Sequence, residues 1–386
     1  MTRLPTALVL GAGIMGLCAA WGLARAGFRV EVVEQDPVPN PRGASVDEHR
    51  LIRHAYGSQH GYMRMVAPAY RAWDALWRDL GRALHVPTGV LALAGTPGGW
   101  LAQSRDALRG DGHGVETLSA ARVAAQYPFL DPAGIVAAFR MRAGGVLLAR
   151  PIVAALAAHL ARRGVTLTRA RAETVDAARA MIRLQDGGMR AADLLVVAAG
   201  PWAPRLLPAL AARVRPSRQV VVYLAPPADL AEAWARAPML LDIGEGAGFY
   251  AVPPVAGTPL KVGDHRFSRR GDAEADPREA SAPEVEEILA QVRPRLRAAV
   301  TYRVLGGRAC YYDVEERERF ILEPLSPGCF VMTGFSGQGF KFAPLLGLAL
   351  ARAASDRALA PGLPAWAAGE APPPPGLLDA LESASA

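Results

Sequence analysis

The first stretch of the chain carries a regular succession of apolar and polar segments. Residues 7–10 form a short, uninterrupted apolar run, which is typical of a buried strand. Residues 14–26 are predicted as a helix, and apolar residues run or alternate again at 29–34, which predicts a second strand. Glycines fill the gap between the first strand and the helix. The pattern therefore predicts a strand–turn–helix–strand unit of a parallel α/β fold.

The same periodicities recur along the rest of the chain. Aromatic residues repeat at helical spacing in 68–84, which predicts a helix with Pro68 in its first turn, where no N–H is needed. Ser281 and Glu284 can form a capping box at the start of another helix. The other predicted elements are helices at 151–163 and 342–354, strands at 165–175, 194–199, 218–224 and 329–335, turns at 186–188 and 336–339, and a loose tail beginning at 372–375.

A glycine motif lies between the first strand and helix. Gly11 allows the turn, Gly13 lets the backbone approach a pyrophosphate, and Gly16 lets the helix pack on the strand. Glu34 ends the second strand, where an acid accepts hydrogen bonds from ribose. The motif predicts a dinucleotide, NAD or FAD. The uncharged run 4–24 would also suit a signal peptide or membrane anchor, but its glycines favour the buried nucleotide-binding unit and no membrane association.

A second glycine-rich strand–turn–helix at 333–342 distinguishes the two cofactors. A helix N-terminus stabilises negative charge by about 0.3–2 kcal/mol, and such charge collects at the N1–C2=O edge of a flavin on reduction. The segment 194–200, followed by Trp202, resembles the strand that returns to the nucleotide in flavoproteins. Because a NAD enzyme has no need of the second loop, these segments favour FAD.

Three features of the composition add to this picture. The net charge of +7 raises nucleic acid as a partner, but the arginines are spread without a run of like charges, which predicts solvated surface and no nucleic-acid face. Cys18, Cys310 and Cys329 are too few for a disulfide framework and fit a reducing cytoplasm. Lys261 and Lys341 are the only lysines among 43 basic residues. Chance could leave two, or these positions need a compact ammonium instead of a guanidinium.

The predicted fold is α/β (α+β overall), with a Rossmann-like FAD-binding domain and a second, mixed-sheet substrate domain. Both domains are expected to be discontinuous. The FAD-binding domain takes residues 1–85, 149–215 and 319–370, the substrate domain takes 86–148 and 216–318, and 371–386 form a C-terminal tail.

Five segments in order resemble the D-amino-acid-oxidase-like flavoproteins, in the branch of monomeric sarcosine oxidase and N-methyltryptophan oxidase. They are the N-terminal glycines, RLIRHAYG at 50–57, LKVGDH at 260–265, ACYYD at 309–313 and GFSGQGFK at 334–341. The resemblance runs through nearly the whole chain. Five ordered motifs are far more specific than any single one.

The resemblance implies roles for individual residues. Cys310 occupies the position of a cysteine that forms a thioether to the flavin 8α-methyl group, and its thiolate should lie near positive charge. Arg53 and Lys341 occupy the positions of a pair that binds the substrate carboxylate. Lys261 occupies the position of a lysine on the other flavin face that helps oxygen to react.

Further positions follow from the same resemblance. Arg50, His265 and Tyr312 join Lys261 as expected catalytic or flavin-proximal residues, and Tyr250 and Gln338 join the substrate-binding pair. For the tyrosines and the histidine, ordinary aromatic packing against a flavin is an equal alternative. The expected cofactor contacts are Gly11, Gly13, Ile14, Met15, Gly16, Glu34, Arg42, Ser45, Arg50, Ala172, Gly200, Trp202, Cys310, Phe335, Gly337, Gly339, Phe340 and Lys341.

Four positions depart from the branch pattern, and they leave the substrate open. Gln338 replaces a histidine, Val46 and His49 replace smaller or more polar residues, and Asp264 replaces an aromatic or basic residue. The sequence nevertheless predicts a monomeric, cytoplasmic FAD-dependent amine oxidase. Its expected reactants are oxygen and a small secondary amine, or an N-methyl or cyclic amino acid, and its products an imine and hydrogen peroxide. No metal site is expected.

Three alternatives remain at this level. One is a flavin dehydrogenase of the same fold with another electron acceptor, and another is a tRNA-modifying FAD oxidoreductase. The third is a non-catalytic FAD-binding module.

Overall fold

The computed structural model describes residues 3–243, 248–264 and 266–382. A six-stranded sheet in the order β19-β20-β13-β1-β2-β9 forms the centre of one half of the molecule. Its neighbours pair in parallel, except that the edge strand β19 is antiparallel. The strands are β1 (Thr6–Leu10), β2 (Arg29–Glu34), β9 (Thr166–Arg169), β13 (Leu194–Val197), β19 (Ile321–Ser326) and β20 (Cys329–Thr333).

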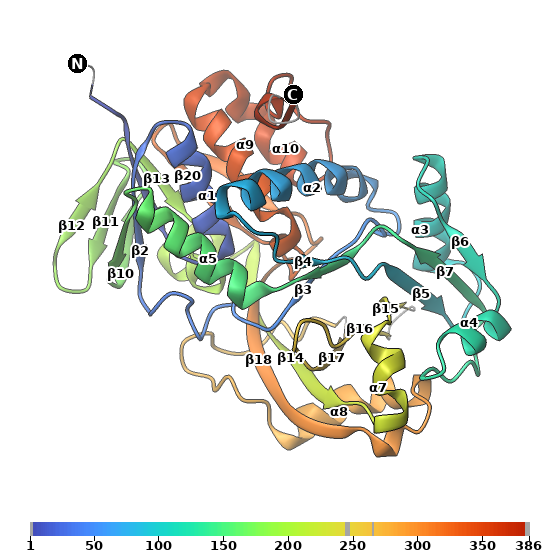
Figure 1. The fold of residues 1–386 in the computed structure, drawn as a ribbon. Coiled ribbons are helices and arrows are strands. Elements are labelled where there is room, and N and C mark those ends of the chain that lie inside the picture. Colours follow the sequence, from blue (N-terminus) through green and yellow to red (C-terminus); the bar gives the residue numbers. More distant parts are fainter. Residues whose placement is uncertain (1–2, 244–247, 265, 383–386) are drawn as a thin grey trace.

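Both faces of this sheet are covered, which explains the continuous apolar strands. Val9, Val32 and Val196 face a core shared with four helices, whereas Leu8 and Val197 face a small three-stranded sheet. Figure 1 shows these helices together on one side of the sheet. They are α1 (Ile14–Arg25), α2 (His60–Leu80), α5 (Ala149–Arg162) and α9 (Ala343–Ser355), and the small sheet is β10 (Ala172–Asp176), β11 (Met181–Leu184) and β12 (Met189–Ala191).

Helices α1 and α9 approach each other backbone to backbone. A Cβ on Gly22 would lie 2.5 Å from the carbonyl oxygen of Gly347, and a Cβ on Gly347 would lie 2.3 Å from that of Cys18. Any side chain at either glycine would therefore force the helices apart. This crossing fixes both helices that follow the glycine-rich turns.

The other half is an eight-stranded mixed sheet in the order β18-β14-β17-β16-β15-β5-β7-β6, with its own apolar core. Its strands come from two separate parts of the chain, and Figure 1 shows them beside the helical half. They are β5 (Val90–Ala94), β6 (Glu116–Leu118), β7 (Ala137–Met141), β14 (Val214–Ala225), β15 (Met239–Ile243), β16 (Gly248–Val252), β17 (Leu260–Asp264) and β18 (Arg303–Glu315). The helices of this half are α3 (Gly99–Gly110), α4 (Ala120–Gln126), α7 (Ala228–Ala235) and α8 (Ala282–Val292).

Short elements complete the described chain. They are a three-stranded sheet of β3 (Arg50–Ile52), β8 (Gly145–Leu147) and β4 (His85–Val86), the helices α6 (Ala203–Leu206), α10 (Leu363–Ala367) and α11 (Asp379–Glu382), and six 3₁₀ turns, η1 (Gly200–Trp202), η2 (Pro208–Leu210), η3 (Arg293–Arg295), η4 (Ala299–Thr301), η5 (Gly339–Phe342) and η6 (Arg357–Gly362). Among residues 3–243, 248–264 and 266–382, no helix combines the length and apolar character needed to span a bilayer.

The mixed α/β fold class and the N-terminal unit are confirmed, but three local predictions need correction. The strand predicted at 165–175 is two strands, β9 and β10, which belong to different sheets. Helix α2 starts eight residues before Pro68, so the proline lies inside the helix. The tail is not loose, because Leu377 and Leu381 are buried in the main core. The capping box of Ser281 is present.

Candidate functional site

A cavity of about 640 Å³ opens at the carboxyl ends of the parallel strands. Nucleotides bind at this edge of open α/β sheets, and the volume lies within the range of about 300–1,000 Å³ for small-molecule sites. Most of the predicted cofactor residues line it, namely Gly11, Gly13, Ile14, Met15, Glu34, Ser45, Arg50, Ala172, Gly200, Trp202, Phe335, Gly337, Gly339 and Phe340.

The first glycine turn has the form of a phosphate cradle. Gly11 has a φ of +109°, and a Cβ there would lie 2.4 Å from the carbonyl oxygen of Ala198. Gly16 does not line the cavity, because it packs the helix against the turn: its Cβ would lie 1.9 Å from the carbonyl oxygen of Gly11. The backbone N–H of Ile14 points out of the helix N-terminus and donates to Oγ of Ser45 at 2.9 Å. A dinucleotide pyrophosphate fits this combination of bare backbone and helix N-terminus.

Glu34 lies at the end of β2 and is buried. It accepts hydrogen bonds from the backbone N–H of Ala12 at 2.8 Å and from Nδ2 of Asn40 at 3.0 Å. Burial raises the pKa of the Glu34 carboxyl, while these hydrogen bonds lower it. The sequence did not single out Asn40, which orients the carboxylate from the loop after β2.

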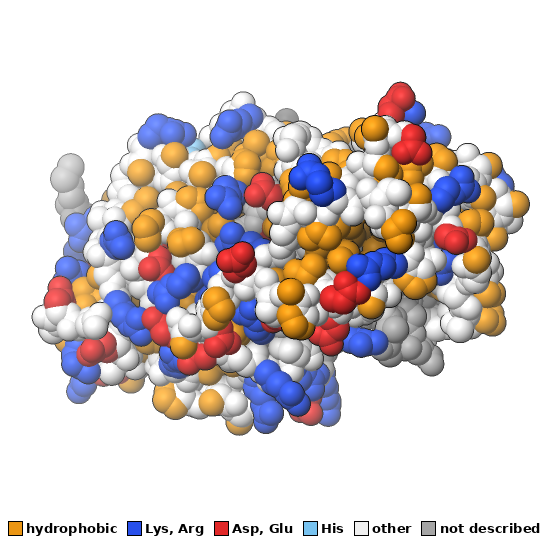
Figure 2. Space-filling view, turned by 90° about the horizontal axis from the view of Figure 1, so that it is seen from below, with side chains coloured by type: hydrophobic (Ala, Val, Ile, Leu, Met, Phe, Trp, Pro, Cys, Tyr) orange, Lys and Arg blue, Asp and Glu red, His pale blue; other side chains and the backbone are white. Residues whose placement is uncertain are grey.

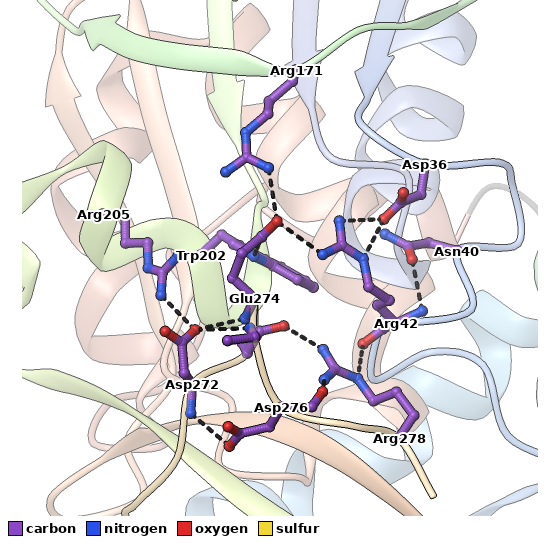
Figure 3. Close-up of polar contacts among 12 residues, drawn as sticks. Asp36, Asn40, Arg42, Arg171, Trp202, Arg205, Asp272, Glu274, Asp276 and Arg278 are labelled. Atoms are coloured by element: carbon purple, nitrogen blue, oxygen red, sulfur yellow. Dashed lines mark hydrogen bonds and ion pairs between the residues drawn. The ribbon is translucent and has the colours of Figure 1, made fainter.

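Arg42 lies outside the cavity lining and takes part in a network at its rim (Figure 3). Glu274, from the loop after β17, accepts hydrogen bonds from Arg171 at 2.8 Å and from Nε1 of Trp202 at 2.8 Å, and it pairs with Arg42 at 3.0 Å. The network joins the half of the molecule built on the eight-stranded sheet to the half built on the six-stranded sheet, called the nucleotide half below. The predicted cofactor contact of Arg42 stays a prediction.

A second cavity of about 90 Å³ shares a wall with the first, since both are lined by Arg50, Tyr312, Gly337 and Phe340. The structure brings the other predicted substrate and oxygen residues into this pocket, namely Arg53, Tyr250, Lys261, Gln338 and Lys341. His265 lies outside the described residues.

Arg53 and Lys341 are two buried cations in this pocket, 7% and 6% exposed. Within the described part of the chain neither forms an ion pair, and Nη1 of Arg53 has no hydrogen-bond partner. The Arg53 guanidinium lies 4.7 Å from the ring centre of Tyr56, and Nζ of Lys341 lies 5.4 Å from it. Burial lowers the pKa of both side chains, and Arg53 lowers that of Lys341 further. A bound anion would offset the repulsion between these two positive charges.

Gln338 lies next to these cations. Its Nε2 donates to Oε2 of Glu318 at 2.7 Å, and its Oε1 has no partner among the described residues. Burial raises the pKa of Glu318, while Gln338 and Arg53 lower it. Glu318 was not recognised from the sequence, because it lies outside the motifs.

Lys261 is almost fully buried, 2% exposed, and is held by a carboxylate. Its Nζ donates to Oδ2 of Asp47 at 2.8 Å and to the carbonyl oxygen of His49 at 2.6 Å. Asp47 also accepts hydrogen bonds from Arg50 and from the hydroxyl of Tyr223. Sequence reasoning missed Asp47 and Tyr223, although Asp47 lies only three residues before Arg50.

Cys310 is buried on β18, two residues before Tyr312, so both side chains are on the same face of the strand. Burial raises the pKa of its thiol, while the positive charges of Arg50 and Lys261 lower it. Asp47 raises it, and Cys310 lines neither cavity, so its attachment to the flavin stays a prediction. Cys18 and Cys329 are also buried free thiols.

Asp313 ties β18 to the second glycine-rich turn. Its Oδ2 accepts from Oγ1 of Thr333 at 3.0 Å, and its carbonyl oxygen accepts from the backbone N–H of Ser336 at 3.0 Å. Burial raises the pKa of the Asp313 carboxyl to about 6, against the effect of hydrogen bonds from Thr333, Phe335 and Gly334.

Comparison with known proteins gives the family. The model of the DAO family, described as FAD dependent oxidoreductase, matches residues 6–353. The chain belongs to this family. As a DAO-family FAD-dependent oxidoreductase, it requires the cofactor that the glycine cradle and the large cavity fit.

Curated relatives cover almost the whole chain. Monomeric sarcosine oxidase from Bacillus sp. (strain B-0618) is 27% identical over 358 residues, 90% of this chain and 91% of that protein. N-methyl-L-tryptophan oxidase from Yersinia pestis (strain Pestoides F) is 27% identical over 362 residues, 91% of this chain and 95% of that protein.

Solved structures share the DAO-family fold. NikD, an amino acid oxidase of nikkomycin biosynthesis, superposes with a TM-score of 0.77 at 22% identity, covering 92% of this chain and 95% of its own. Glycine oxidase from Geobacillus kaustophilus gives 0.76 at 21% identity, with coverage of 92% and 95%.

Two remaining observations concern other kinds of site. Among the described residues there is no group of three or more His, Cys, Asp or Glu side chains that could hold a metal ion. Figure 2 shows basic side chains interspersed with acidic ones on one face of the molecule.

Proposed function

We propose that this protein is an FAD-dependent amine oxidase for a small secondary amine that carries a carboxylate, such as an N-methyl or cyclic amino acid. The proposed products are an imine, which hydrolyses, and hydrogen peroxide. The observation that carries the proposal is the pair of buried cations, Arg53 and Lys341, in a pocket that shares a wall with the nucleotide cavity.

Electrostatics supports a carboxylate ligand. A buried cation is costly unless it is paired, and the unpartnered Nη1 of Arg53 is a donor without an acceptor among the described residues. A carboxylate between Arg53 and Lys341 would accept charge-assisted hydrogen bonds from a fork and from a point charge. It would thereby fix the orientation of the rest of the substrate. The pocket volume of about 90 Å³ favours a small molecule.

The relatives support the amine and oxygen parts of the proposal. Monomeric sarcosine oxidase and N-methyl-L-tryptophan oxidase carry their substrate classes in their names, and both are oxidases. Bound FAD supplies the two-electron oxidant, held by the glycine cradle, Glu34 and the second glycine-rich turn, with Cys310 as its proposed covalent attachment. Lys261 supplies positive charge beside the pocket, where it can favour the reaction of oxygen. We also propose that the protein acts as a monomer in the cytoplasm.

A flavin dehydrogenase with another electron acceptor is the second candidate. The specific observation in its favour is the ion pair between Lys261 and Asp47, because a nearby carboxylate reduces the field that the ammonium exerts on oxygen.

A matched substrate panel tests the proposal. Purified protein is offered N-methyl and cyclic amino acids, each beside the same amine without its carboxylate. We expect anaerobic bleaching of the flavin by the acids, only weak bleaching by the amines, and one peroxide per amine when air is admitted. Bleaching without peroxide would favour the dehydrogenase. Equal bleaching by acids and decarboxylated amines would rule out the proposed carboxylate site.

A further inference from the structure

Asp47 is a buried carboxylate that accepts hydrogen bonds from three side chains and from the backbone N–H of Glu48. Its side chain is 5% exposed. Oδ2 accepts from Nζ of Lys261 at 2.8 Å and from Nη1 of Arg50, while Oδ1 accepts from the hydroxyl of Tyr223. An ammonium has three N–H groups, of which Asp47 accepts one and the carbonyl oxygen of His49 accepts another at 2.6 Å. The third is then available to a ligand in the pocket that Lys261 lines.

These groups come from three separate segments. Tyr223 and Lys261 are cross-strand partners on β14 and β17, so their side chains lie on the same face of the eight-stranded sheet. Asp47 and Arg50 come from the segment that enters β3, on the nucleotide half. The carboxylate therefore joins the two halves next to Arg50, which lines both cavities.

The cluster has a defined charge. Lys261 and Arg50 contribute two positive charges and Asp47 one negative charge, which leaves +1. Burial and Lys261 lower the pKa of His49 to about 3, so its ring is neutral. Four other titratable groups that face the cluster are neutral because burial raises their pKa values, namely Tyr223, Tyr250, Tyr312 and Cys310. Two further groups lie around them: the positive charge of Arg308 acts on Tyr223 and Cys310, and Asp264, whose pKa burial raises, acts on Tyr312.

The carboxylate also opposes the loss of the lysine proton. Burial lowers the pKa of Lys261, and Arg50 lowers it further, whereas Asp47 raises it. Burial opposes ionisation of Asp47 too, but Lys261 and Arg50 bring the pKa of the Asp47 carboxyl well below its usual range. Without the carboxylate, the buried ammonium of Lys261 would lie beside the largely buried guanidinium of Arg50, with no negative charge in the cluster to offset their repulsion.

We propose that Asp47 is a positioning residue for the proposed amine oxidation, which holds Lys261 beside Arg50, keeps the Lys261 ammonium charged, and limits the net charge of the Lys261–Arg50–Asp47 cluster to +1. The inference rests on the proposed function in taking the flavin ring to lie against the shared wall. It adds a residue through which the strength of the Lys261 field is set.

A double-mutant cycle tests the coupling, with inorganic sulfite as the probe and dissociation constants measured as bleaching of the flavin spectrum. Sulfite adds to a flavin with its own electron pair and leaves negative charge on the ring, so nearby positive charge tightens its binding without turnover. The four proteins are the wild type, Asp47→Asn, Lys261→Met and the double variant, all as purified holoprotein. Comparing proteins at one pH cancels the ionisation of sulfite.

We expect Lys261→Met to weaken sulfite binding by about 10-fold or more in the wild-type background, on the basis of one unit charge in a partly dry site. In the Asp47→Asn background the same change should have a clearly different effect, because Lys261 there is displaced or has lost its proton. Equal effects in both backgrounds would overturn the inference, since Lys261 would then be charged and in place without Asp47.

One further outcome and one control variant complete the test. No effect of Lys261→Met in either background would also overturn the inference, while the substrate panel judges the amine-oxidase proposal independently. Asp242→Asn is the matched control, because it removes a carboxylate from a partly buried pair with Arg295 elsewhere in the same sheet, 2.7 Å apart. It should show no coupling to Lys261.

If Asp47→Asn does not retain FAD, a milder variant can replace it in the cycle. Tyr223→Phe removes one hydrogen bond to Asp47 and leaves every charge in place. Its cycle with Lys261→Met should show coupling of the same sign and smaller size. Strict additivity in that cycle would overturn the inference in the same way.

Discussion

The Nζ of Lys341 donates a hydrogen bond to the carbonyl oxygen of Gln338, 3.1 Å away and one turn earlier in the same glycine-rich segment. The segment thus holds its own ammonium in the pocket that Arg53 lines. Nε1 of Trp73 on α2 donates to the carbonyl oxygen of Lys341 at 2.8 Å and fixes its backbone. The cation is therefore held in place before any substrate enters.

Lys341→Met should weaken the binding of carboxylate substrates by about 10- to 150-fold, because a charge-assisted hydrogen bond is worth about 1.5–3 kcal/mol. Steady-state and anaerobic titrations with matched acids and decarboxylated amines measure the effect. The amines should bind as before. An equal loss of affinity for the acids and the amines would show that Lys341 does not bind the carboxylate.

Cys310→Ser should release the flavin when the protein is precipitated with acid, whereas wild-type protein should keep its yellow colour in the pellet. The reason is the proposed thioether. Cys329→Ser is the control, since that thiol is also buried but lies on β20, whereas Cys310 lies on β18 two residues before Tyr312, which lines both cavities. Colourless wild-type pellets would refute covalent attachment.

Lys261→Met should leave anaerobic flavin reduction by substrate largely intact and slow reoxidation by oxygen by orders of magnitude. Lys261→Arg is the more discriminating variant, since the charge is kept while shape and hydration change. We expect the arginine to restore little of the lost reoxidation rate. Stopped-flow measurement of both half-reactions distinguishes the steps. Unchanged reoxidation in Lys261→Met would put the dehydrogenase ahead of the oxidase.

Asp313 should make stability depend on pH. Its folded pKa of about 6 is above the ordinary value of 3.8, so the neutral form favours folding. This contribution is complete below about pH 4 and is lost as pH rises through about 6. Asp313→Asn should therefore be more stable than wild type above about pH 6, by up to about 3 kcal/mol at 1.36 kcal/mol per pKa unit.

Paired denaturant titrations at both ends of this range measure that difference. Near pH 4 the two proteins should have nearly equal stability, because both then carry a neutral group. A variant that is less stable than wild type at every pH would show that the ionised carboxylate is needed to hold the turn at Gly334 and Phe335.

Local patterns determined much of this protein. The strand–turn–helix around Gly11 and Gly16 follows from glycines whose added Cβ atoms would collide with backbone. Such requirements act between near neighbours, so they are visible in the sequence. The ordered motifs indicated the family, and they named Arg53, Lys341 and Lys261 before the structure placed them in one pocket.

Only the tertiary structure determined which charged side chains neutralise one another. Asp47 and Tyr223 are separated by 176 residues along the chain, and their contact depends on the register of β14 and β17 and on how the two halves meet. Burial then makes the charges of Lys261 and Asp47 depend on each other, since it removes water from both side chains together. The spacing of residues in the sequence reveals neither the register of β14 and β17 nor the loss of water around Lys261 and Asp47. The sequence could therefore identify the lysine, and only the fold supplied its carboxylate.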